Sequence, residues 1–171
     1  MTGNGYFQLA LYLLALIGLG WPLGLYMARV YRDEPPGFVR WLRPVENGLY
    51  RVCGVKPGDD MPWTRYAFAM LAFNLLGFLA VYALQRFQVW LPLNPQDLAA
   101  VTPDSSFNTA ISFATNTNWQ GYGGETTMSY LTQMLGLTVQ NFVSAATGMA
   151  VLVALMRGFT RREAGGVGNF W

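Results

Sequence analysis

The sequence of 171 residues contains no histidine and a single cysteine, Cys53. Without histidine there can be no Ser-His-Asp triad and no histidine metal site, and one cysteine forms neither an intrachain disulfide nor a zinc cluster. Charged residues are only 12% of the chain, against 53% hydrophobic residues, about half the charged share of a soluble domain. The net charge of +2 is too small to indicate a nucleic-acid partner. These shortages argue against a soluble enzyme and favour a membrane protein.

Four runs contain no Lys, Arg, Asp or Glu, namely residues 1–28, 66–85, 105–124 and 126–156. About 20 apolar residues in an α-helix cross a bilayer core about 30 Å thick. Three of the runs are apolar enough, and they predict transmembrane helices within 1–28 (from Tyr6), over 66–84 and over 130–156. The first run lacks the basic start of a signal peptide, so we interpret it as a retained helix. The predicted fold class is therefore an all-α integral membrane protein.

Basic residues are concentrated in two of the segments between and after these spans. The connection 29–65 and the tail 157–171 hold almost all of them, namely Arg29, Arg32, Arg40, Arg43, Arg51, Lys56, Arg65, Arg157, Arg161 and Arg162. The segment 85–129 has one, Arg86. Because cytoplasmic loops carry the excess of positive charge, we expect a multi-pass protein with its N-terminus outside and both basic segments in the cytoplasm.

The cytoplasmic connection 29–65 contains a short apolar stripe. Val45, Leu49 and Val52 follow Pro44 at helical spacing. This pattern predicts either an amphipathic helix in the membrane interface or a short helix packed under the spans. Residues 33–37 and 56–60 are rich in Pro, Gly and acidic residues, which is typical of solvated turns.

Residues 105–124 are free of charge but crowded with polar side chains, so they cannot all face lipid. Polar, irregular backbone is tolerated at membrane depth only where protein or water surrounds it, which predicts a re-entrant loop. Thr102, Pro103 and Asp104 favour a helix start with a hydroxyl cap, and we expect a short pore helix over 103–114. The helix C-terminus would then place its partial negative charge inside the membrane, which favours a cation.

The segment that follows the pore helix is the predicted site. Residues 115–118 would return outward in an extended form whose carbonyl oxygens replace the hydration shell of an alkali cation; they are Thr115, Asn116, Thr117 and Asn118. Gln120 and Gly121 adjoin this filter, and Glu125 near the mouth would raise the local cation concentration. The alternative is an external polar loop packed on the spans, in which Glu125 is only a solvated acid.

A polar stripe in the third span could extend the cation path. Gln133, Gly136, Gln140 and Ser144 recur at spacings of three and four, so on an α-helix they would share one face. Such a stripe either lines a wet path or packs closely against another helix through small residues. We treat these four residues as candidate pore-lining residues.

Four sequence motifs lie at residues 91–96 (LPLNPQ), 115–120 (TNTNWQ), 124–127 (GETT) and 136–142 (GLTVQNF). Together these motifs resemble one transporter family, the A subunit of the Kdp potassium-transporting P-type ATPase. The resemblance implies a member of the superfamily of potassium transporters, with four helix–pore loop–helix repeats and one extra helix at each end. It implies that potassium is the transported ion, that four non-identical segments form the filter, and that 115–118 is the first of them. It also implies a catalytic B subunit and small C and F subunits, in the plasma membrane of bacteria and some archaea.

The functional expectation is a potassium-binding and translocating subunit that contributes one of four filter segments and hydrolyses nothing. Residues 1–28 would be the extra N-terminal helix, 66–156 the first repeat, and 157–171 the lead to further repeats, so we expect a fragment. The sequence has neither a nucleotide-binding Gly-rich loop with Lys nor an Asp-Lys-Thr-Gly phosphorylation run, and we expect no organic cofactor. The alternatives are a stand-alone oligomeric channel-like transporter and a non-conducting membrane scaffold.

Overall fold

The structure is a computed structural model that describes residues 3–32, 34, 37, 41–161 and 165–171. Most of the expected turn at 33–37 lies outside the described residues, as do Arg40 and Arg162. Every regular element of the described residues is a helix, and three helices are long and apolar enough to cross a membrane. The all-α class with three candidate spans is thus confirmed. The chain forms two compact units, residues 1–56 and 57–171, which are described separately.

The first unit includes helices α1 and α3. Helix α1 (Gly3–Tyr31) has 29 residues and includes Pro22 in its interior. At about 1.5 Å per residue its length is about 43 Å, longer than the bilayer core. Helix α3 (Arg43–Val52) begins one residue before Pro44. Val45, Leu49 and Val52 on its apolar stripe are exposed, so both expectations for this helix, interfacial or packed under the spans, stay predictions.

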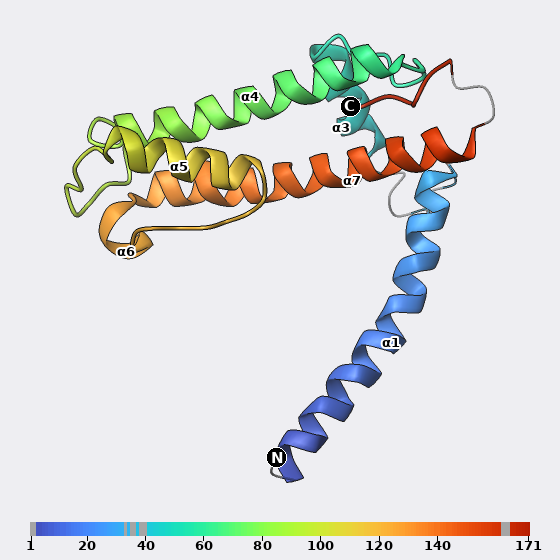
Figure 1. The fold of residues 1–171 in the computed structure, drawn as a ribbon, viewed down its shortest axis with the longest axis horizontal. Helices are drawn as coiled ribbons and strands as arrows, with labels where there is room; N and C mark the ends of the chain where they lie inside the picture. Colours follow the sequence, from blue (N-terminus) through green and yellow to red (C-terminus); the bar gives the residue numbers. More distant parts are fainter. Residues whose placement is uncertain (1–2, 33, 35–36, 38–40, 162–164) are drawn as a thin grey trace. The chain divides into compact units, whose positions relative to one another are not determined.

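The second unit is built on two long helices that lie side by side (Figure 1). Helix α4 (Trp63–Phe87) contains the predicted span 66–84 and extends it by three residues at each end. The other long helix begins at Tyr130. It is a π-helix over Thr132–Thr138 (η1) and continues as α7 (Val139–Thr160). The short helix α5 (Pro103–Ala114) packs against both α4 and α7 (Figure 1).

Two small clusters of buried side chains hold this unit together. The pore-helix cluster joins α5 to α4 and to the start of the third span; its members are Val81, Val101, Ala110, Phe113, Met128 and Leu137. The tail cluster lies at the other end of α4; its members are Met61, Tyr66, Ala69 and Phe170. Most other large apolar side chains of the long helices are exposed. Apolar faces of this size suit contact with lipid or with further helices.

Residues 165–171 fold back onto the beginning of α4 (Figure 1). The backbones of Met61 and Gly168 pair through an N–H···O bond of 2.9 Å. The Asp60 carboxylate accepts hydrogen bonds from the Gly168 amide at 2.6 Å and the Arg161 guanidinium at 2.8 Å. The Phe170 ring meets the Tyr66 ring edge to face at 5.5 Å. We call this arrangement the tail clasp.

We predict that Gly168→Ala destabilises the second unit by about 1 to 3 kcal/mol. Gly168 has φ +101°, and a Cβ there would collide with the Arg157 guanidinium. Denaturant unfolding in detergent micelles measures the change. Gly158→Ala is the matched control, because a Cβ at that helical position meets nothing within 4 Å and Ala favours helix by about 1 kcal/mol. Equal stability of the two variants would contradict the prediction.

Candidate functional site

Helix α5 begins and ends at the residues predicted for the pore helix. Pro103 occupies its first turn together with Asp104, whose charge suits the positive end of the helix dipole. The expectation of a hydroxyl cap was wrong, because the Thr102 side chain makes no capping hydrogen bond. The Thr102 backbone carbonyl instead accepts the Ser106 amide at 2.9 Å. The backbone geometry set by Pro103 is therefore enough to start the helix.

Gln85 fixes the first half of α5 against α4. Its side chain is fully buried. Its Nε2 atom donates to the Val81 carbonyl at 3.0 Å and to the Ser106 carbonyl at 3.3 Å. Its own backbone carbonyl accepts the Val101 amide at 3.2 Å, and the Arg86 guanidinium also donates to Val101. The segment entering α5 is thus tied to the last turns of α4.

Gln88, the residue that directly follows α4, connects four segments of the chain. Its Nε2 atom donates to the carbonyls of Ala99 at 2.5 Å and Thr127 at 2.9 Å. Its Oε1 atom accepts the Ser129 amide at 3.1 Å and the Thr132 hydroxyl at 3.3 Å. Sequence reasoning missed both glutamines. The available signal for these two buried residues was the presence of two amide side chains, three residues apart, at the end of an apolar helix.

The backbone after α5 differs from the predicted extended strand. Thr115 is near-helical with φ −88° and ψ 2°. Asn116 and Asn118 have positive φ of 58° and 56°. Asparagine tolerates this left-handed region better than most residues. The segment 115–118, which we call the filter segment, therefore begins as a tight turn at the helix end, because its amides return to the helix.

All four backbone amides of the filter segment donate to carbonyls of α5. Those of Thr115 and Asn116 bond to Ile111 at 2.9 Å and Phe113 at 3.3 Å. Those of the next two residues both bond to Ser112, at 2.9 and 3.2 Å. Across the described residues, no hydrogen bond ends on a backbone carbonyl oxygen of 115–118. The segment is exposed, so it presents backbone acceptors whose bonding capacity is unused.

The side chains of the filter segment are held on two different helices. The Thr115 and Thr117 hydroxyls lie 2.8 Å apart, and the Thr115 hydroxyl donates to Ile111 of α5 at 2.9 Å. The Asn116 Oδ1 atom accepts a hydrogen bond of 3.3 Å from the Ser144 hydroxyl of α7. In the part of the chain that the structure describes, no group of three or more His, Cys, Asp or Glu side chains could hold a metal ion. Any cation bound here would rely on neutral oxygens.

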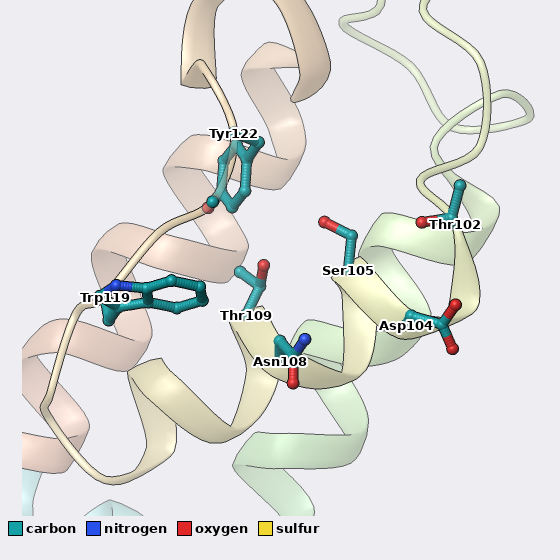
Figure 2. Close-up of a pocket in the computed structure, with 8 residues that line it drawn as sticks. Thr102, Asp104, Ser105, Asn108, Thr109, Trp119 and Tyr122 are labelled. Atoms are coloured by element: carbon teal, nitrogen blue, oxygen red, sulfur yellow. The ribbon is translucent and has the colours of Figure 1, made fainter.

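The segment after the filter is separated from α5 by a polar cavity of about 310 Å³. Figure 2 shows Trp119 and Tyr122 on the returning segment, facing polar side chains of α5. Gly121 also lines this cavity, whereas Gln120 is not among its lining residues. Burial raises the pKa of the Tyr122 hydroxyl, and the nearby Thr109 hydroxyl opposes this shift. Tyr122 therefore stays neutral at physiological pH and offers the cavity a dipole without a charge.

Glu125 lies in the single-turn helix α6 (Gly124–Thr127) and is exposed. It lines a second cavity, of about 450 Å³, together with Gln96, Tyr130, Gln133 and Met134. The Gln133 side chain donates to the carbonyls of Met128 at 2.9 Å and Gly124 at 3.3 Å. Gln133 thus supports the turn that carries Glu125.

The structure places the four candidate pore-lining residues against different neighbours. Gly136 faces α4, where a Cβ would lie 3.2 Å from Leu84. The Gln140 side chain packs on Gly77 of α4, because a Cβ added to Gly77 would lie 2.5 Å from the Gln140 Oε1 atom. Ser144 alone among the four is hydrogen-bonded to the filter segment.

The π-helix η1 lies within this stretch. Gln133 and Gly136 lie within Thr132–Thr138, whereas Gln140 and Ser144 lie beyond it. A π-helical turn closes i→i+5 bonds and so changes the α-helical spacing locally, yet Gly136 and Gln140, on either side of its end, both face α4. No residue pattern in this stretch gave a clear signal of the π-helix.

Residues 10–171 match the model of one family, KdpA, described as the potassium-transporting ATPase A subunit. The chain belongs to the KdpA family. It is 64% identical over its full length to a relative from Chromobacterium violaceum and 67% identical to one from Methylococcus capsulatus. A relative from Ralstonia nicotianae is 67% identical over 96% of the chain. All three relatives are named potassium-transporting ATPase potassium-binding subunit.

The KdpA relatives are much longer than this chain, which spans 28% of the Chromobacterium and Ralstonia proteins and 29% of the Methylococcus protein. The resemblance inferred from the sequence motifs is confirmed at the level of the family. The matched region contains α4, α5, the filter segment and α7.

We predict that Gln88→Ala destabilises the second unit by about 2 to 3 kcal/mol, because it leaves the buried Ser129 amide and two carbonyls without partners. Unfolding in detergent micelles by denaturant measures the loss. Gln96→Ala is the matched control, since Gln96 is an exposed glutamine in the same connection. A Gln88 variant no less stable than the control would show that this hydrogen-bonded centre contributes nothing to the fold.

Proposed function

We propose that this chain supplies the first of four filter segments of a potassium-binding and translocating membrane subunit. The observation that carries the proposal is the unequal use of backbone groups in the filter segment. Its four amides all bond to α5, and its carbonyl oxygens accept no hydrogen bond from the described residues. Free carbonyl oxygens are the groups with which potassium filters replace the ion's hydration shell.

Two further features support a cation. The C-terminal end of α5, where partial negative charge accumulates, is directly followed by the filter segment. The side chains of the segment are hydroxyls and amides, which add neutral oxygens and no fixed charge. One segment offers oxygens from one side only, so a closed cage requires other segments. Within the proposal these come from further repeats of the longer subunit.

The wider assembly is also part of the proposal. The relatives are named as potassium-binding subunits of a potassium-transporting ATPase. We therefore place the subunit in a bacterial or archaeal plasma membrane, with its N-terminus outside, beside a catalytic B subunit and small C and F subunits. In this arrangement the B subunit hydrolyses ATP, and the present chain contributes to ion selection without catalysis.

The filter assignment is tested by Gln120→Arg in the full-length subunit within the assembled complex. A fixed positive charge beside the carbonyl oxygens repels the cation, so we expect the apparent KM for potassium to rise at least about tenfold, or about 1.4 kcal/mol. Selectivity over sodium should fall as well. Potassium-stimulated ATP hydrolysis and rubidium uptake measure both effects.

The matched control for this variant is Ala100→Arg, which adds the same charge to an exposed residue of the connection between α4 and α5. It should change the apparent KM by less than about twofold, because solvent and salt screen exposed charges. An unchanged affinity for both ions in the Gln120 variant would remove the filter assignment.

The backbone geometry gives a separate prediction at Asn118, whose φ is +56°. Glycine adopts positive φ without strain, whereas a β-branched residue pays about 1 to 2 kcal/mol. We therefore expect Asn118→Val to lose about 5- to 30-fold in apparent potassium affinity and Asn118→Gly to stay within about threefold of the parent. Potassium-dependent ATPase titrations compare the two. Equal losses would show that the asparagine side chain matters and the backbone conformation does not.

A further inference from the structure

One hydrogen bond connects the filter segment to a long helix. It joins the Ser144 Oγ atom of α7 to the Asn116 Oδ1 atom at 3.3 Å. Within the described residues, the other hydrogen bonds of 115–118 join this segment to α5 or connect two of its own residues. The filter segment is therefore held on one side by α5 and on the other by a single side chain of α7.

The position of Ser144 makes this contact well suited to orient Asn116. Ser144 is only 4% exposed. Its hydroxyl has a single proton and lies 3.3 Å both from Asn116 Oδ1 and from the Asn141 backbone carbonyl. Asn116 is itself exposed, so this hydrogen bond is sheltered from water on the α7 side only.

Asn116 is the residue at which the chain leaves the helical turn. Its φ is +58°, and its own amide bonds to Phe113. The next two amides both bond to Ser112. Fixing the Asn116 side chain from the α7 side therefore restrains the residue that directs the first free carbonyl oxygens of the segment.

We propose that Ser144 is a positioning residue for the filter, which acts on the cation through Asn116 and does not touch the ion. This inference rests on the proposed function, because it assumes that residues 115–118 select the cation. It assigns a role in selectivity to Ser144, the candidate residue of the polar stripe that is hydrogen-bonded to the filter segment. Gly136 and Gln140, which pack against α4, have no such role.

The experiment uses the full-length subunit in the assembled complex. Ser144→Ala removes the hydroxyl, and Ser144→Cys keeps a side chain of similar size but replaces the hydroxyl with a weak donor. We expect both variants to raise the apparent KM for potassium about 5- to 30-fold, to lower discrimination against sodium, and to leave kcat at saturating potassium within about twofold. This separation of KM from kcat distinguishes misplacement of the filter from general damage.

Thr147→Val is the matched control. Thr147 is also buried on α7, but its hydroxyl bonds only to the Val143 carbonyl of its own helix at 3.0 Å. Its variant should keep the parent KM and selectivity. The proposal is wrong if the Ser144 variants keep the parent KM and selectivity, as the control should. It is also wrong if kcat and KM change together in both Ser144 variants and in Thr147→Val.

Coupling between the two residues gives an independent test. The double variant Asn116→Ala with Ser144→Ala should be no worse than Asn116→Ala alone, because both changes remove the same interaction. Strictly additive losses would overturn the proposal. Should Ser144→Ala prevent assembly, Ser144→Cys serves in the same cycle.

The outcome for Gln120→Arg separates this proposal from the proposed function. If that variant weakens potassium affinity while the Ser144 variants do not, the filter assignment stands and the positioning role of Ser144 fails. If none of them changes the affinity for either cation, both are wrong.

Discussion

The carbonyl oxygen of Ser112 accepts two backbone amides, and the geometry of the filter segment depends on this arrangement. The last carbonyls of a helix have no partners within the helix, and unsatisfied polar groups are costly away from water. The returning amides satisfy the carbonyls of Ile111, Ser112 and Phe113. Within the described residues, they also leave the carbonyl oxygens as the free backbone groups of the filter segment. Under the proposed function, the same interactions that end α5 thus prepare the following residues to bind a cation.

The helix that precedes this turn is itself held by uncharged side chains. Gln85 and Gln88 are fully buried and bond mainly to backbone groups of the connection between α4 and α5, of α5 itself and of the start of the third span. The Gln88 side chain both donates and accepts, whereas within the described residues the Gln85 side chain only donates, and each joins segments of the chain without introducing a charge. Under the proposed function, a charge at this position would compete with the attraction of the filter segment for a cation.

The sequence predicts those features that depend on local chemistry. Thr102, Pro103 and Asp104 predicted where α5 begins, and the charge-free runs predicted three helices able to cross a membrane. The positive φ values of Asn116 and Asn118 arise from amides that return to Ser112, a contact that no periodicity reveals. The π-helix over Thr132–Thr138 has no visible signal in the residue pattern around Gln133. The tail clasp depends on Asp60 meeting residues about a hundred positions away, which a single sequence does not encode visibly.

The two ends of α7 make contacts of very different kinds. Ser144 bonds to Asn116, and about 20 Å further along the same uninterrupted helix Arg157 donates to the Val167 carbonyl of the tail clasp. An α-helix changes its length little, because each turn is fixed by its own hydrogen bonds. An axial shift of the helix at the arginine end would therefore also move the residue that contacts the asparagine. Residues 115–118 and the distant tail are in this way joined through one continuous helix.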